Sequence, residues 1–133
     1  MENGTVLTRE QVFKTLFATA VIAGQEAGKK AKPNPMVVYE AELDDTPKEG
    51  GKAWYVEDGV CGFAWVVVKP GNCPFANFLK KEGFGKYSKY DRGVVIWISD
   101  WNQSLTRKEA HAYAMAKVLR ENGIEAYASS RID

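Results

Sequence analysis

The sequence predicts an α+β fold: a mainly antiparallel sheet with an N-terminal helix, a short middle helix and a long C-terminal helix. Residues 60–68 and 93–99 are apolar on both faces of a strand, which is typical of strands covered on both sides. Residues 8–24 and 106–122 carry apolar side chains at helical spacing behind capping-box patterns. A chain of 133 residues suits a single domain, residues 1–133, with a core that needs no disulfide.

The N-terminal helix is expected to begin at Thr8, which forms a capping-box pattern with Gln11. Gly24 or Gly28 can end it, because glycine readily takes the left-handed conformation that follows many helices. Residues 36–43 then have the composition of a strand.

A hairpin is predicted in the segment AWYVEDGVCGFAWVVV, residues 53–68. Its Asp58-Gly59 pair suits a two-residue type I′ turn, whose twist matches that of the flanking strands. This turn would place Trp54 opposite Phe63. One face of the hairpin would then be mainly aromatic and the other would carry small side chains, which favour a closely packed helix.

The second half of the chain is expected to hold two helices and two strands. Asn72 is placed to cap the short middle helix. Ser104 or Thr106 is expected to cap the long helix, and Thr106 and Glu109 form a second capping-box pattern. That helix would join the strand at residues 93–99 to a last strand, residues 124–128, in a right-handed βαβ crossover.

The predicted strands offer more apolar surface than the predicted helices can cover. A homo-oligomer that buries the aromatic face of each sheet would supply the missing cover. The alternative is that the N-terminal helix, residues 8–24, folds across this face of its own sheet.

Charge and composition exclude several classes of protein. The 18 Lys and Arg residues balance 17 Asp and Glu residues, which is a poor match to a protein that coats nucleic acid, so we expect no such partner. No apolar run reaches the 18 or more residues of a membrane span, and no membrane partner is expected. Cys61 and Cys73 have apolar neighbours and are expected to be free thiols in a reducing cytoplasm.

Catalytic and metal chemistry find little support in the residue pattern. His111 is the only histidine and the usual zinc-ligand spacings are missing, so we expect no metal site and no cofactor. Ser104 lies seven residues before His111, about 10 Å along a helix, which is too far for a direct hydrogen bond. We therefore expect no catalytic residue. A hydrolase using His111 and Asp100 stays an alternative, as does a magnesium site on the acids Asp44, Asp45, Glu57 and Asp58.

Two helix starts resemble places where phosphate binds. Lys69 and Asn72 come just before the short middle helix, and Ser104 and Arg107 lie at the start of the long helix. Helix N-termini present free N–H groups and a positive dipole, which favour anions. The alternative interpretation is ordinary helix capping beside solvated charges.

Aromatic side chains lie close in sequence to cations in two stretches. Tyr90 is followed by Arg92, and Trp101 and Asn102 precede Arg107. Aromatic rings stack on bases while cations meet phosphates, so these residues are candidates for binding a nucleotide. Solvated loops over a core tyrosine are the alternative.

Four stretches resemble a family of small proteins from tailed bacteriophages: CGFAWVVVKPGNCPFANFLKK, GVVIWISDWNQS, RKEAHAYAMAKVLRENGI and AYASSRID. They lie within residues 61–133, and the first 60 residues carry no such likeness. This resemblance implies a viral source more than a function.

The chain also resembles the phage anti-Thoeris sponge proteins in its expected architecture and source. That resemblance implies a homo-oligomeric cage that holds a cyclic ADP-ribose-type signal without cleaving it. It would make Trp101 or Tyr90 a stacking platform and Asn102 a partner of the base edge. Phosphates would be held by arginines: Arg107, Arg120 or Arg131.

The leading hypothesis from the sequence is therefore a phage anti-defence protein in the cytoplasm of an infected bacterium. It would sequester a nucleotide-derived immune messenger, of the cyclic ADP-ribose type or a cyclic oligonucleotide, without cleaving it. The alternatives are an inhibitor or accessory protein that binds a host protein or nucleic acid, and a small nucleotide hydrolase that uses His111.

Overall fold

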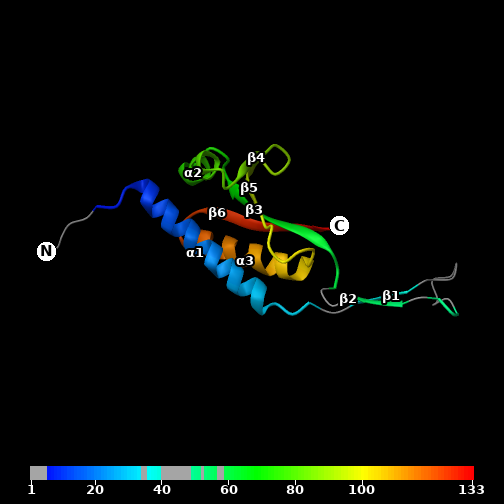
Figure 1. Ribbon diagram of the computed structural model, residues 1–133. Coiled ribbons are helices and arrows are strands. Elements are labelled where there is room, and N and C mark those ends of the chain that lie inside the picture. Colours follow the sequence, from blue (N-terminus) through cyan, green and yellow to red (C-terminus); the bar gives the residue numbers. More distant parts are fainter. Residues whose placement is uncertain (1–5, 34–35, 40–48, 52, 57–58) are drawn as a thin grey trace.

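The predicted α+β class is confirmed in a computed structural model, which has three helices and a four-stranded antiparallel sheet in its main body (Figure 1). The structure describes residues 6–33, 36–39, 49–51, 53–56 and 59–133.

The main sheet contains four strands, in the order β4-β5-β3-β6. They are β3 (Gly62–Lys69), β4 (Lys86–Ser88), β5 (Gly93–Trp97) and β6 (Glu125–Ile132). Each neighbouring pair is antiparallel, and β3 forms a ladder of eight residue pairs with β6. The sheet therefore has β3 and β5 at its centre and β4 and β6 at its edges.

Two helices connect strands that are not neighbours in the sheet. Helix α2 (Pro74–Glu82) joins β3 to β4, and helix α3 (Leu105–Glu121) joins β5 to β6. Each helix links two strands that run in the same direction with one antiparallel strand between them. This is the β-α-β-β-α-β arrangement of ferredoxin-like domains. The predicted connection of two strands of the same direction through the long helix is present, with β3 lying between them.

The helix starts differ in detail from those predicted. Cys73, not Asn72, caps α2, because Pro74 occupies the first helical position and its predecessor becomes the cap. Ser104 caps α3 by accepting a hydrogen bond from the Arg107 N–H. Of the two caps that the sequence offers for α3, Ser104 is therefore confirmed, and Thr106 lies inside the helix.

Helix α1 (Arg9–Lys30) begins at Thr8 with the predicted capping box but runs through both glycines that were expected to end it. Gly24 and Gly28 are buried where α1 crosses α3, and the two helices lie side by side (Figure 1). A Cβ on Gly24 would overlap the His111 ring, and one on Gly28 would overlap the Trp101 ring. These glycines therefore serve close helix packing rather than helix termination.

The predicted hairpin was wrong. Strand β2 (Ala53–Val56) pairs with β1 (Met36–Tyr39) in a separate two-stranded ribbon that lies apart from the main sheet (Figure 1). The two sides of β3 are occupied by β5 and β6, and an eight-residue ladder with β6 offers more pairing than a four-residue strand could. Asp58 lies outside the described residues, as does the second half of the predicted strand at residues 36–43.

The two faces of the sheet are chemically different. Ala64, Val66 and Val68 of β3 face the helices and are fully buried in the core. Helix α1 contributes Phe13 and Phe17 to this same core, so it does not fold across the aromatic face as the alternative required. All three described helices pack on this side. None of them is long and apolar enough to cross a membrane.

We call the other side the open face. By strand alternation and the observed registers it carries the odd-numbered residues of β3, β5 and β6 and the even-numbered residues of β4. Its larger side chains are Phe63, Trp65, Lys69, Lys86, Trp97, Tyr127 and Arg131.

Close packing of α1 on α3 predicts that Gly24→Ala is destabilising. Alanine favours a helix interior by about 1 kcal/mol over glycine. The added methyl group would nevertheless displace the His111 ring, and overpacking costs about 1–3 kcal/mol. We expect a net loss of up to about 2 kcal/mol in the free energy of unfolding, measured by urea denaturation. Lys14→Ala, at an exposed position of the same helix, is the control and should change little, because lysine and alanine are both good helix formers. A stabilised Gly24→Ala would contradict the packing argument.

Candidate functional site

The open face holds a cluster of aromatic side chains on the two central strands. Trp65 of β3 and Trp97 of β5 are cross-strand neighbours, with ring centroids 5.0 Å apart and planes at 47°. Phe63 meets Trp97 edge to face, with centroids 6.1 Å apart. Trp97 is 56% exposed. Large aromatic side chains left in solvent on a sheet face are typical of a surface that binds something.

Cations lie over the aromatic rings of this face. The Arg131 guanidinium is 5.2 Å from the Phe63 ring centroid, and the Lys108 ammonium reaches the same ring from α3 at 5.5 Å. The Lys69 ammonium lies 5.2 Å from the Tyr127 ring centroid. Contacts of this length are favourable cation–π interactions. The open face therefore combines flat apolar surfaces with positive charge.

A hollow of about 520 Å³ lies on the open face beside the two tryptophans. Its lining comes from all four strands and the β4–β5 loop: Trp65, Ser88, Tyr90, Asp91, Trp97, Ser129, Ser130 and Arg131. Pockets for small organic ligands commonly have 300–1,000 Å³, so the hollow has room for a mononucleotide.

The β4–β5 loop forms one wall of the hollow and has a defined shape. The Ser88 hydroxyl donates to the Asp91 carboxylate at 2.8 Å and accepts from the Asp91 N–H at 3.1 Å. Arg92 follows with a left-handed φ of 56°. Tyr90 at the tip is 93% exposed, so its ring is free to cover a ligand.

One polar group in the wall of the hollow has no partner. The Trp65 indole N–H is buried and makes no hydrogen bond within the described part of the chain. An unsatisfied buried donor costs about 1–3 kcal/mol. Such groups are rare in native proteins, and this N–H is itself enclosed by protein atoms rather than exposed to the hollow.

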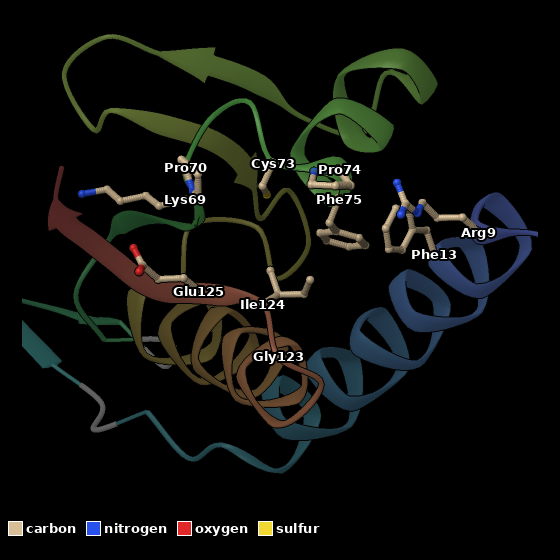
Figure 2. A pocket seen from close by; sticks show the side chains of 10 residues that line it. All are labelled: Arg9, Phe13, Lys69, Pro70, Cys73, Pro74, Phe75, Gly123, Ile124 and Glu125. Carbon is tan, nitrogen blue, oxygen red and sulfur yellow. The ribbon is translucent and has the colours of Figure 1, made fainter.

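A second hollow, of about 350 Å³, lies at the start of α2 but does not gather the expected cations (Figure 2). Arg9 and Lys69 both line it, but Arg9 extends toward Phe13 whereas Lys69 extends away from the hollow. Lys69 runs toward the Tyr127 ring instead, and Glu125 adds a negative charge. Asn72 is exposed, outside this lining. Lys69 and Asn72 therefore do not converge on one phosphate-sized position.

Trp101 and Arg107 are engaged in the contact between α1 and α3. The Trp101 indole N–H donates to His111 Nδ1 at 3.0 Å. Arg107 Nη1 donates to the carbonyls of Gly28 and Lys29, which caps the C-terminal end of α1. Both contacts hold the strand-to-helix turn against α1.

The remaining predicted residues divide between the open face and other surfaces. Tyr90 and Arg131 lie together at the hollow on the open face. Arg120 donates to the Ala126 carbonyl at 2.9 Å and stacks on Tyr113. Asn102 is exposed at the turn before α3, with a left-handed φ of 50°. Ser104 is buried at the helix cap.

The sequence analysis missed the site residues Phe63, Trp65 and Trp97. The signal was present, because alternation had already separated an aromatic face from a small-residue face. We assigned that face to an oligomer contact and sought ligand contacts in the polar stretches instead.

His111 is 5% exposed and packs beneath α1. Burial lowers its pKa below the ordinary value, and the Asp100 carboxylate opposes this shift by a smaller amount. With Nδ1 accepting from Trp101, the ring is held in its neutral form. Among the described residues no three His, Cys, Asp or Glu side chains gather as metal ligands. Asp44, Asp45, Glu57 and Asp58 lie outside those residues.

The chain matches no protein-family model, no curated protein and no solved structure. Its class therefore rests on its own structure: an α+β protein of the split βαβ arrangement whose open sheet face is aromatic and cationic.

The buried histidine predicts a pH dependence of stability. Because the folded-state pKa lies below that of the unfolded chain, the unfolded state takes up the proton first as the pH falls. The contribution of His111 to the free energy of unfolding is fully present above pH 6.5, the pKa of an ordinary histidine in the unfolded chain. It is lost progressively as the pH falls below that value. Urea denaturation at about pH 7.5 and about pH 5.5 should show a loss for the wild type and a smaller loss for His111→Gln. Equal losses in the two proteins would contradict this assignment.

Proposed function

We propose that this protein binds a nucleotide-derived ligand on the open face and holds it without chemical change. The observation that carries the proposal is the Trp65–Trp97 pair on the central strands, with the Arg131 guanidinium close by over Phe63. A base needs a flat apolar surface and a phosphate needs a fixed cation, and this face offers both within one hollow.

The aromatic rings supply the part of the affinity that depends on the base. Stacking of a base on an aromatic side chain contributes about 1–3 kcal/mol by alanine substitution. Trp97 has more than half of its surface free for this contact, and Tyr90 lies on the loop that could close over the other side of the ligand.

Arg131 supplies the contact to phosphate. Its guanidinium is planar and presents several N–H donors in a fixed geometry that suits phosphate oxygens. Its place over the Phe63 ring limits the orientations it can take. The Ser129 hydroxyl lines the same hollow and can bond to ribose or phosphate oxygens.

Sequestration of an immune messenger is the specific form of this proposal. The ligand would be of the cyclic ADP-ribose type or a cyclic oligonucleotide, held in the cytoplasm of the infected cell. The support is the composition of the site, whose lining offers stacking surfaces and hydrogen-bonding groups, together with the resemblance to the phage sponge proteins.

A short single-stranded nucleic acid is the second candidate. Aromatic side chains on the central strands of a four-stranded sheet of this topology stack bases in a common class of RNA-binding domain. Trp65 and Trp97 occupy such positions on β3 and β5. The formal net charge of +1 favours a short or small ligand over a long strand, because long strands are bound mainly through many neutralised phosphates.

Binding measurements on purified protein test the proposal directly. We expect isothermal titration or tryptophan fluorescence to detect at least one of cyclic ADP-ribose, its isomers and cyclic oligonucleotides. Trp97→Ala should weaken that binding about tenfold or more, from the lost stacking. Arg131→Gln should weaken it similarly and reduce its dependence on salt. Heating the complex should release the ligand intact.

The control variant is Tyr87→Ala, which removes an exposed aromatic side chain on β4 that does not line the hollow. It should bind as the wild type does.

Binding of single-stranded oligonucleotides alone would favour the second candidate. Binding of none of these ligands, or equal losses in Trp97→Ala and Tyr87→Ala, would rule out the open face as a nucleotide site.

A further inference from the structure

Strand β6 forms a long edge of the main sheet. It has eight residues and, within the described part of the chain, pairs on one side only, with β3, whereas the opposite edge strand β4 has only three. A long exposed edge presents a row of backbone N–H and C=O groups and is a template for another strand. Proteins usually shorten, cover or charge such edges, so an uncovered one of this length calls for a partner.

The alternation of an antiparallel ladder shows which groups of β6 point outward. The Asp133 N–H donates to the Cys61 carbonyl across the pair, so the odd-numbered positions bond to β3. The N–H and C=O groups of the even-numbered residues therefore face the free edge. Arg120 already donates to the carbonyl of Ala126. Ala128 and Ser130 come next along the edge.

We infer that two copies of this chain pair through β6, antiparallel about a two-fold axis at Ala128, to form one continuous eight-stranded sheet. The inference goes beyond the proposed function and does not depend on it. In this register the N–H and C=O of Ala128 bond to those of Ala128 in the second copy. The Ala126 N–H bonds to the Ser130 carbonyl, and the Ala126 carbonyl accepts the Ser130 N–H with its second lone pair, beside the bond that it already receives from Arg120.

Charge complementarity selects this register. With Ala128 on the axis, Glu125 of each copy lies directly opposite Arg131 of the other, and both project from the open face. The two-fold symmetry forms this pair twice. Moving the axis by one residue, to Tyr127 or Ser129, still pairs the even-numbered residues but places neither charge opposite the other, and an axis at Ser129 would put Glu125 opposite Asp133. The side chains that meet on the helix side of the axis are small ones: Ala126, Ala128 and Ser130.

The helix layer is compatible with the same axis. Helix α3 packs on both β3 and β6, so it lies above the space between them. With strands about 4.8 Å apart, the axis would bring α3 to about 10 Å from its copy, near the usual spacing of packed helices. Tyr113 is 60% exposed on this side and lines a hollow of about 190 Å³ with Glu109 and Ala128. The Tyr113 ring of the second copy is available to fill it.

This edge pairing leaves the aromatic face free, unlike the face-to-face oligomer expected from the sequence. It joins the two open faces side by side. Tyr127 of one copy would lie opposite Ser129 of the other, which lines the nucleotide-sized hollow. The second copy would thus complete one side of the surface around the hollow.

Light scattering coupled to size exclusion, and sedimentation for the dissociation constant, test the inference on the full chain. The wild type should be a dimer. Ala128→Pro removes one outward N–H and leaves the ladder to β3 intact, and edge strands tolerate proline at such positions. It should be a folded monomer by circular dichroism, whereas Ala128→Ser, which keeps the N–H, should stay a dimer.

Charge reversal tests the register independently of proline. Glu125→Arg and Arg131→Glu should each raise the dimer dissociation constant about tenfold or more, because each places like charges opposite one another twice. The double variant should restore dimerisation. A monomeric wild type, a dimer unaffected by Ala128→Pro, or a double variant no tighter than the single ones would overturn the inference. Ligand binding by the Ala128→Pro monomer would show that the open face works without the dimer.

Discussion

The packing of all three helices on one face of the main sheet is the constraint from which the other features follow. Small and β-branched side chains on β3, such as Ala64 and Val66, let the helices approach that face closely and bury it completely. The opposite face then receives every second side chain of the same strands, because the side-chain period of a strand is two. Trp97 is exposed on that face for this reason, and Phe63 and Trp65 are half-buried beside it. The strand alternation that directs small side chains into the core therefore also places the aromatic side chains on the open face.

The contact between α1 and α3 determines how closely these two helices pack within the helix layer. Two buried glycines let the helices approach until the His111 and Trp101 rings lie against the α1 backbone. The hydrogen bond from Trp101 to His111 and the bonds from Arg107 to the end of α1 then join these elements. Polar residues that look like an active site in the sequence thus act together as a polar junction within an apolar layer. Their density reflects the need to satisfy hydrogen bonds at a partly buried helix crossing.

Local chemistry allowed the fold class and the helices to be predicted from the sequence, whereas strand pairing could not be. The capping box at Thr8 depends on residues three apart and is formed as expected. The pairing of β3 with β6 joins segments more than 50 residues apart, and no local pattern distinguishes it from the hairpin that Asp58-Gly59 favoured. The residues of the candidate site could be predicted only in part for the same reason. Alternation identified the aromatic face, but only the topology showed that the N-terminal helix lies on the other side and leaves that face open.

Strand β6 contributes both to the open face and to the proposed contact between two copies. Arg131 lies over Phe63, beside the hollow on the open face, and it is also close to the free edge of the sheet. A guanidinium has five N–H donors, so one arginine can stack on a ring, contact a phosphate and meet a carboxylate at once. A second copy paired at β6 would hold Glu125 near Arg131 and limit the freedom of its side chain. Less conformational entropy would then be lost when a ligand binds, which is how preorganisation raises affinity. In that arrangement dimerisation and ligand binding would favour one another through a shared side chain, without any change in the fold.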